Sequence, residues 1–223
     1  MEVSGPIGIY NRESRGCLLP FLADELRKVE TILDVGCGKG FITLQLAKLF
    51  EKAKVIGVDI SPYLSRVKDD LSKPSEEVVR RLTRNRYVPM KKEEIREANK
   101  RIELVRGDAN SLPFRSETTD LTVAIAILSY VENPNGVIKE LIRVTKPGGV
   151  IYVESKAIDT ITNEIVYPLL RLYPSEAERG RIRYRKPISI LREHGEDIGA
   201  QVAERAGNFL WEIDRSIAIY RRF

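Results

Sequence analysis

Three glycines at alternate positions follow a short apolar run and carry the clearest chemical signal in the sequence. The run Thr31–Val35 is typical of a buried strand, and Phe41–Phe50 has the apolar spacing of a helix. The glycines between them are Gly36, Gly38 and Gly40. Glycine lets the backbone turn tightly and approach a ligand closely, and the helix start presents unpaired N–H groups. In open α/β sheets such a turn binds nucleotides, although the dehydrogenase fingerprint G-x-G-x-x-G would need glycine in place of Phe41.

Acidic side chains accompany the first three predicted strands. Asp34 precedes the glycines, Asp59 ends the second strand, and Asp108 follows the third. The carboxyl ends of parallel strands meet at one edge of a sheet, so we expect these acids to converge on one crevice. Asp59 can accept both hydroxyls of a ribose, and Asp108 can accept an adenine amino proton. The alternative for Asp59 is a helix cap before Pro62, a task that Ser61 fits better.

The elements that must position these residues follow from alternating strand and helix patterns. Strands are predicted at Thr31–Val35, Lys54–Val58, Ile102–Arg106, Leu121–Ile127 and Gly149–Glu154. Helices are predicted around Leu18–Leu26, Phe41–Phe50, Gly136–Val144 and Ile188–His194, and two final strands at Gln201–Glu204 and Ser216–Arg221. Such alternation predicts a Rossmann-like, doubly wound α/β sheet with right-handed crossovers.

Composition limits the class of protein. The chain has 223 residues, of which 43% are hydrophobic, and its longest apolar run, Thr122–Leu128, is too short for a membrane helix. Two cysteines and a single histidine provide neither a disulfide framework nor a metal cluster. With no apolar leader segment at the start, we expect one cytoplasmic domain over residues 1–223 that uses no metal.

Two segments are basic, residues 63–101 and 171–192, within a chain of formal net charge +5. Such segments attract an acidic partner, or they form a solvated, ion-paired surface, and both interpretations stay open. A crossover helix, a strand and two short loops need only about 25 of the residues between Asp59 and Asp108, so we expect a helical insert within 63–101, with the surplus near Lys73–Lys100. Our hypothesis is that this insert and a substrate-side segment at 156–192, including Arg179–Lys186, cover the substrate end of the crevice and favour an anionic substrate.

With these motifs in this order, the sequence resembles a known family, the class I S-adenosylmethionine-dependent methyltransferases. The resemblance covers residues 30 to about 155. Within the family, the chain is most similar to the branch that includes quinone-biosynthesis C-methyltransferases and many small-molecule methyltransferases. It rests on Asp34-x-Gly36-x-Gly38-x-Gly40, Gly57-Val58-Asp59-Ile60-Ser61, Gly107-Asp108-Ala109, Leu112-Pro113-Phe114, Asp120-Leu121 and Lys146-Pro147-Gly148-Gly149. It implies a seven-stranded, mainly parallel sheet whose last strand is antiparallel.

The resemblance also implies roles for residues around S-adenosylmethionine. Gly36, Gly38, Lys39 and Gly40 would line the methionine part, and Asp34 would help to hold its ammonium group. Asp59 would take the ribose hydroxyls and Ile60 would pack on the adenine. Asp108 and Ala109 would meet the adenine edge, and the backbone of Ile125 would contact the amino-acid end.

Methyl transfer requires mainly alignment and exclusion of water, so a catalytic side chain is not guaranteed. Tyr130 can face the substrate or pack, and His194 can act as a base or end a surface helix. In relatives the position of Ser129 or Tyr130 often carries histidine, and the absence of histidine here puts general-base catalysis from that loop in doubt. We expect a small-molecule acceptor, with an RNA or protein methyltransferase and a non-catalytic cofactor-binding protein as alternatives. The sequence does not set the oligomeric state.

Overall fold

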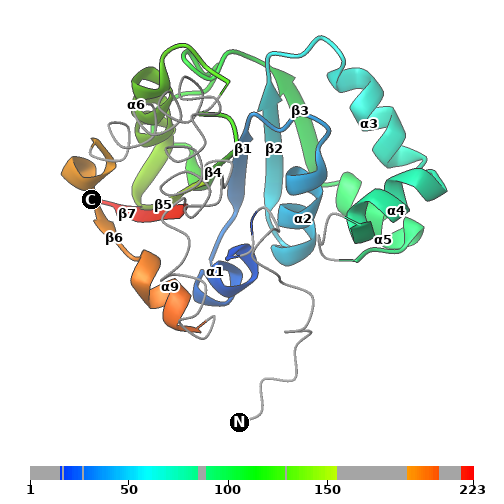
Figure 1. Cartoon of the computed structure of the whole chain (residues 1–223), viewed down its shortest axis with the longest axis horizontal. Coiled ribbons are helices and arrows are strands. Elements are labelled where there is room, and N and C mark those ends of the chain that lie inside the picture. Colours follow the sequence, from blue (N-terminus) through cyan, green and yellow to red (C-terminus); the bar gives the residue numbers. More distant parts are fainter. Residues whose placement is uncertain are drawn as a thin grey trace, which may run out of the picture.

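A seven-stranded sheet forms the centre of the protein, in the order β3-β2-β1-β4-β5-β7-β6 (Figure 1). The computed structural model describes residues 16, 18–26, 28–84, 89–128, 130–154, 190–205 and 217–223. The strands are β1 (Thr31–Val35), β2 (Lys54–Asp59), β3 (Ile102–Arg106), β4 (Thr119–Ile125), β5 (Thr145–Glu154), β6 (Gly195–Asp197) and β7 (Ile217–Arg222). The first five are parallel, while β7 is antiparallel to β5 and to β6. The Rossmann-like sheet with an antiparallel last strand is therefore confirmed.

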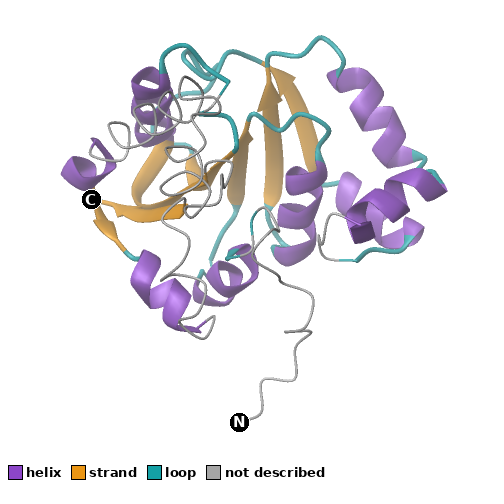
Figure 2. Cartoon of the chain, in the orientation of Figure 1, coloured by secondary structure: helices purple, strands orange, loops and turns teal. Residues whose placement is uncertain are grey.

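Helices cover both faces of this sheet (Figure 2). They are α1 (Leu19–Glu25), α2 (Phe41–Leu49), α3 (Leu64–Ser72), α4 (Glu76–Arg84), α5 (Lys92–Asn99), α6 (Pro134–Val144) and α9 (Gly199–Arg205). Buried side chains of α1, α2, α5 and α9 pack against one face, and those of α6 pack against the other. The near-continuous burial of β1 and β4 agrees with parallel strands that are covered on both sides.

The predicted strand at Gln201–Glu204 is wrong, because these residues lie within α9. The segment that follows Gly199 consists mainly of good helix formers, and its buried Val202 stands four positions after the buried Ile198 that precedes the helix. The side chain of Asp197 accepts the N–H of Gly199 at 2.9 Å, which satisfies one of the free donors at the helix start. The strand that completes the sheet is the shorter segment just before it, β6.

Asp120 fastens the starts of three strands together. Its carboxylate accepts the N–H groups of Glu30 and Thr31 at 3.0 and 2.9 Å, and it pairs with the ammonium of Lys146 at 2.7 Å. These contacts join β1, β4 and β5 at the amino ends of the strands. These contacts lie at the opposite end of the strands from the glycines. The carboxyl ends of the strands therefore stay available for a binding site.

Candidate active site at the carboxyl edge of the sheet

The parallel strands end together in what we call the carboxyl edge, formed by Val35, Asp59, Arg106, Ile125 and Glu154. The turn from β1 to α2 is fixed to β2 there, since the N–H groups of Gly36 and Cys37 donate to the Val58 carbonyl at 2.8 and 3.1 Å. The three glycines all have positive φ, at 78° for Gly36, 51° for Gly38 and 73° for Gly40. Residues with a Cβ rarely adopt this backbone conformation, which explains the spacing of the glycines.

The three glycines have different surroundings. A Cβ added to Gly36 would lie 2.6 Å from Cδ1 of Ile127, and one added to Gly40 would lie 3.2 Å from Cγ1 of Val67. A Cβ on Gly38 would meet nothing within 4 Å. Gly36 is therefore needed for packing and Gly40 is closely packed, whereas Gly38 borders open space that a ligand can occupy.

The Asp59 carboxylate joins two loops of this edge. One oxygen accepts the Gly38 N–H at 2.9 Å and the other accepts the Ser61 N–H at 2.9 Å. Asp59 makes no side-chain cap on α3, because that helix begins after Tyr63 and has no such cap. Each carboxylate oxygen can accept more than one hydrogen bond, so capacity remains for ribose hydroxyls.

Asp34 is buried beneath the glycine turn. Its carboxylate accepts the Thr43 hydroxyl at 2.6 Å and also the Thr43 backbone N–H, which holds the start of α2. Burial raises its pKa to about 7, the Thr43 bonds oppose this rise, and the charge of Asp59 adds to it. A nearby positive group, such as the ammonium expected here, would favour the ionised form of Asp34.

Apolar and polar groups meet at the expected adenine position. Ile60 follows β2 and is 67% exposed, which is unusual for a large apolar side chain. The exposed Asp108 accepts the Asn110 N–H at 2.8 Å, and Ala109 beside it is buried. The structure thus brings Ile60, Asp108 and Ala109 to the edge that carries Asp59, while the side chain of Lys39 is exposed at the glycine turn.

Beyond β4, the chain turns at Ala126, which has a φ of 61° and donates its N–H to the Glu154 carbonyl at 2.7 Å. This explains why the strand ends at Ile125, two residues earlier than predicted.

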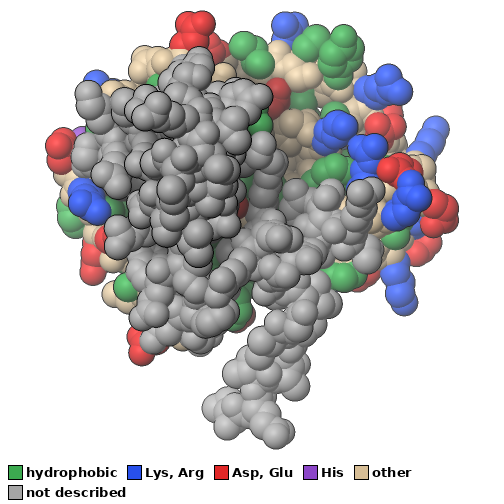
Figure 3. Space-filling model, viewed as in Figure 1, with side chains coloured by type: hydrophobic (Ala, Val, Ile, Leu, Met, Phe, Trp, Pro, Cys, Tyr) green, Lys and Arg blue, Asp and Glu red, His purple; other side chains and the backbone are tan. Residues whose placement is uncertain are grey.

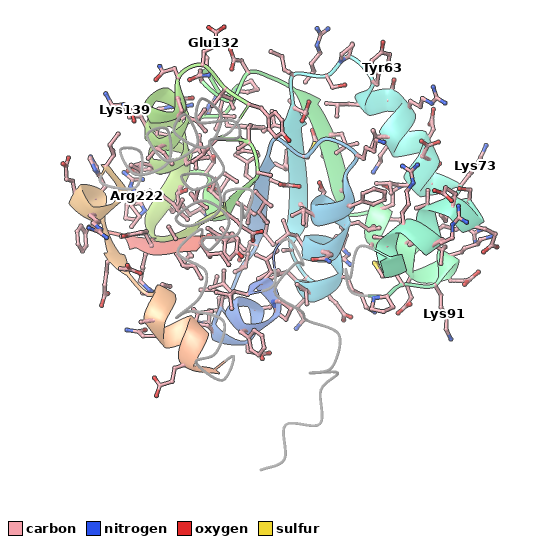
Figure 4. The ribbon with its side chains drawn as sticks, viewed as in Figure 1. Tyr63, Lys73, Lys91, Glu132, Lys139 and Arg222 are labelled. Atoms are coloured by element: carbon pink, nitrogen blue, oxygen red, sulfur yellow. The ribbon has the colours of Figure 1, made fainter. Side chains whose placement is uncertain are left out.

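Tyr130 lies in the following loop and is 72% exposed. Its ring is therefore accessible to a substrate rather than packed in the core. Figure 4 shows Tyr63 and Glu132 from the loops after β2 and β4 at the same edge. Ser129 lies outside the described residues.

Sequence reasoning missed Glu154, which ends β5 and is 6% exposed. One of its carboxylate oxygens accepts the Gly16 N–H and the Tyr152 hydroxyl, each at 2.8 Å. This contact brings Gly16, three residues before α1, to the carboxyl edge. The available signal was its position at the end of the fifth strand, since the other three acids lie at or near the ends of the first three strands.

The structure places His194 away from these groups. It directly precedes Gly195, which pairs with Arg222, and Arg221 pairs with Val150 near the start of the buried part of β5. Its ring Nδ1 lies 2.9 Å from the Ile190 carbonyl in its own helical turn. His194 therefore lies at the amino ends of the parallel strands, and the surface-helix interpretation fits it better than a role as a base.

Within the basic insert, α5 lies away from the carboxyl edge, whereas α3 begins beside this edge and carries Val67, the neighbour of Gly40. Arg101 donates to the Ala47 and Phe50 carbonyls at 2.7 and 3.1 Å, and Lys48 pairs with Glu94 at 2.7 Å. Helix α5 thus packs against the end of α2 that lies farthest from the glycines. Figure 4 shows Lys91 correspondingly distant from the edge that carries Tyr63.

Charges of the insert are also compensated locally. Arg80 and Arg81 both bond to Glu77, and Lys92 pairs with Glu76. Figure 3 shows basic and acidic side chains interspersed on this part of the visible face. Our hypothesis that the insert favours an anionic substrate stays a prediction, because the side chain of Arg84 and residues 179–186 lie outside the described residues.

Comparison with known proteins decides the family. A family described as "Methyltransferase domain" matches residues 33–153, which is more than half of the chain. The chain belongs to the S-adenosylmethionine-dependent methyltransferases. The match includes the glycine turn, Asp59 at the end of β2, Asp108 after β3, and the chain from within β1 to within β5.

Individual relatives of this methyltransferase are distant. An uncharacterized methyltransferase of Schizosaccharomyces pombe is 34% identical over 148 residues, or 66% of this chain and 46% of that protein. A chloroplastic 2-methyl-6-phytyl-1,4-hydroquinone methyltransferase of Oryza sativa subsp. japonica is 29% identical over 157 residues, or 70% of this chain and 38% of that protein. The chain thus spans less than half the length of these two curated relatives.

A solved structure extends the likeness in fold. The cyclase SpnF superposes with a TM-score of 0.50, 20% sequence identity and coverage of 92% of this chain and 79% of that one. At such low identity the likeness concerns the fold alone. Because that protein is named a cyclase, the fold by itself does not determine the reaction.

The residues of this methyltransferase fit S-adenosylmethionine, the cofactor of the family. Gly38 leaves space for a ligand to approach the backbone, Asp59 presents a preoriented carboxylate, and Ile60 exposes an apolar surface beside it. Among the described residues, no group of three or more His, Cys, Asp or Glu side chains could hold a metal ion. Cys37 is a buried thiol whose pKa is raised by burial. Within the same residues, no helix is long and apolar enough to cross a membrane.

Proposed function

We propose that this protein transfers the methyl group of S-adenosylmethionine to a small-molecule acceptor. The observation that carries the proposal is the contact between the Asp59 carboxylate and the Gly38 N–H, at 2.9 Å, beside space that a Cβ at Gly38 would enter. This contact orients the acid that accepts ribose hydroxyls and keeps the glycine backbone open to the methionine part of the cofactor.

Different residues at the carboxyl edge bind different parts of the cofactor. Asp59 binds the ribose, Ile60 packs on the adenine, and Asp108 and Ala109 contact the adenine edge. The ionised form of Asp34, buried below, attracts the ammonium group. When bound, S-adenosylmethionine supplies a methyl group on a positively charged sulfur, which leaves by in-line displacement. The protein therefore needs to align an acceptor and exclude water more than to supply a strong base.

A small molecule is the acceptor class that the observations favour. The hydroquinone methyltransferase relative acts on a small molecule by its name, and the exposed ring of Tyr130 follows β4 at the edge where the acceptor must approach. An RNA acceptor would be favoured by unpaired basic side chains. The guanidinium groups of Arg80 and Arg81, however, are engaged with Glu77 on the same helix.

Calorimetric titration with S-adenosylmethionine, and separately with NADH, tests the cofactor assignment. We expect the wild-type protein to bind S-adenosylmethionine and not NADH. Asp59→Ala should weaken that binding by about 10- to 100-fold, because hydrogen bonds to a charged group contribute roughly 1.5–3 kcal/mol. Asp70→Ala, at an exposed acid of α3, is the matched control and should bind as the wild type does.

Transfer of a labelled methyl group then tests the acceptor class. Fractions of small molecules, RNA and protein from a cell extract are incubated with the enzyme and the labelled cofactor. Label in the small-molecule fraction supports the proposal, and label in RNA or protein replaces it by that alternative. Cofactor binding without label in any fraction would indicate a protein that binds the cofactor and performs no methyl transfer.

A further inference from the structure

The loop between β3 and β4 packs along α6. Its residues Asp108 and Ala109 are those assigned to the adenine edge, and Leu112 and Phe114 follow them. Ala109 and Leu112 are buried in the same apolar cluster as Val137 and Leu141 of α6. Apolar packing of this kind holds a loop near a helix but is non-directional, so a fixed loop position needs directional contacts as well.

A charged pair on α6 provides these directional contacts. Arg143 donates to the Phe114 carbonyl at 2.8 Å and to the Leu112 carbonyl at 3.1 Å. Glu140 accepts the Leu112 N–H at 2.7 Å. The two side chains also bond to each other twice, at 2.7 Å for each bond. Two residues of the helix thus bind three backbone groups of the loop with charge-assisted hydrogen bonds.

The pair is also set apart from an ordinary surface ion pair by its burial. The side chains of Arg143 and Glu140 are 33% and 17% exposed, and the bond from Arg143 together with the Leu112 N–H lowers the pKa of Glu140. Exposed pairs contribute little, but a half-buried bidentate pair that also satisfies backbone groups restricts geometry.

Close packing holds the same loop at the other end of α6. A Cβ on Gly136, in the first turn, would lie 2.6 Å from Oδ1 of Asn110. Asn133 caps this turn by accepting the Gly136 N–H at 3.0 Å. The loop therefore follows α6 from its first turn to its last, with Asp108 and Ala109 at the end nearer the expected cofactor.

We propose that Glu140 and Arg143 are positioning residues for the adenine end of the cofactor site. They contact no cofactor atom; they hold the loop that carries Asp108 and Ala109. This inference rests on the proposed function, because it takes the adenine to lie at those residues. It makes α6, a helix outside the glycine turn, a determinant of cofactor affinity.

The test compares Arg143→Ala and Arg143→Lys with Arg101→Ala. Arg101 is a matched control, since it also donates from both terminal nitrogens to two backbone carbonyls and is partly buried, but at the distant end of α2. Each purified variant is titrated with S-adenosylmethionine and with 5′-methylthioadenosine, which shares the adenosine part and lacks the amino-acid part. Urea unfolding of each variant confirms that it is folded under the titration conditions.

We expect Arg143→Ala to weaken binding of both ligands by about tenfold and by the same factor, because the altered loop contacts their shared part. Arg143→Lys should recover part of the affinity, since an ammonium can bond to one carbonyl but lacks the planar fork. Arg101→Ala should lower the urea midpoint and leave both affinities unchanged.

Unchanged affinities in Arg143→Ala would overturn the inference, and so would an equal loss of affinity in Arg101→Ala. A loss confined to S-adenosylmethionine would also overturn it, because the defect would then lie at the amino-acid end. Failure of the wild-type protein to bind S-adenosylmethionine would overturn the proposed function itself, and this result is distinguishable from the other three.

Discussion

Adding one methyl group at Gly38 should impair cofactor binding more than folding, and the same change at Gly36 should do the reverse. Both residues have positive φ, so either alanine would adopt a backbone conformation that costs about 1 kcal/mol relative to glycine. They differ in what the new Cβ meets. At Gly36 it would lie 2.6 Å from Ile127 Cδ1 and 2.9 Å from Ile127 Cβ, and at Gly38 it would meet nothing within 4 Å.

The magnitudes follow from this difference. Overpacking a well-packed site costs about 1–3 kcal/mol, so Gly36→Ala should lower the free energy of unfolding by about 2–4 kcal/mol in total. Gly38→Ala should lower it by only about 1 kcal/mol. In the bound state, however, the Gly38 methyl group would occupy space needed by the methionine part of the cofactor. A clash of similar size there corresponds to a dissociation constant about tenfold or more higher.

Two measurements on each variant decide the matter, namely urea unfolding without ligand and calorimetric titration with S-adenosylmethionine. Wild-type affinity in Gly38→Ala would refute the assignment of the open space to the cofactor. A loss of stability in Gly38→Ala as large as that in Gly36→Ala would refute the packing argument.

Two further predictions concern acids on either side of this turn. Asp34 has a folded-state pKa of about 7 against an ordinary 3.8, so the folded chain holds a proton that the unfolded chain releases between these pH values. Compared with Asp34→Asn, the wild type should therefore lose stability as the pH rises from about 4 to 7, while its affinity for S-adenosylmethionine should rise towards pH 8 as the carboxylate ionises. Urea midpoints and titrations at pH 5, 6, 7 and 8 measure both trends, and parallel curves for the two proteins would contradict them. Asp120→Ala should lower the free energy of unfolding by about 2–3 kcal/mol, because the Glu30 and Thr31 N–H groups and Lys146 lose their shared acceptor. Its cofactor affinity should equal that of the wild type, and a weaker affinity would show that the amino ends of the strands are coupled to the site.

Local patterns were sufficient to predict most of the fold. β1 and β3 have the predicted bounds, because each is a short apolar run flanked by charged or turn residues. Gln201–Glu204 was mistaken for a strand because four residues are too few to distinguish the periodicity of a helix from that of a strand. The cap from Asp197 that marks the helix start depends on a side-chain conformation, which the sequence does not show. The position of β7 between β5 and β6 depends on pairing between distant segments and was not predicted; the family resemblance supplied only its antiparallel orientation.

The candidate site was predictable where function depends on position along a strand. Asp34, Asp59 and Asp108 were found because acids at the ends of parallel strands must meet at one edge. The sequence did not decide between the two roles of His194, and the packing of α5 against α2 was not predictable, since both depend on tertiary contacts. Net charge shows how many basic groups a segment holds, but it does not show that Glu77 engages two of them.

The position of β7 has a consequence for biosynthesis. β7 lies between β5 and β6 in the sheet, yet the ribosome makes it after both. Until Ile217–Arg222 emerges, the outer edge of β5 has no strand to pair with, and β6 has no neighbour in the sheet. An open, apolar strand edge is a template for pairing with another chain, and pairing of distant segments is slow. The yield of soluble protein should therefore depend strongly on how quickly these last strands dock.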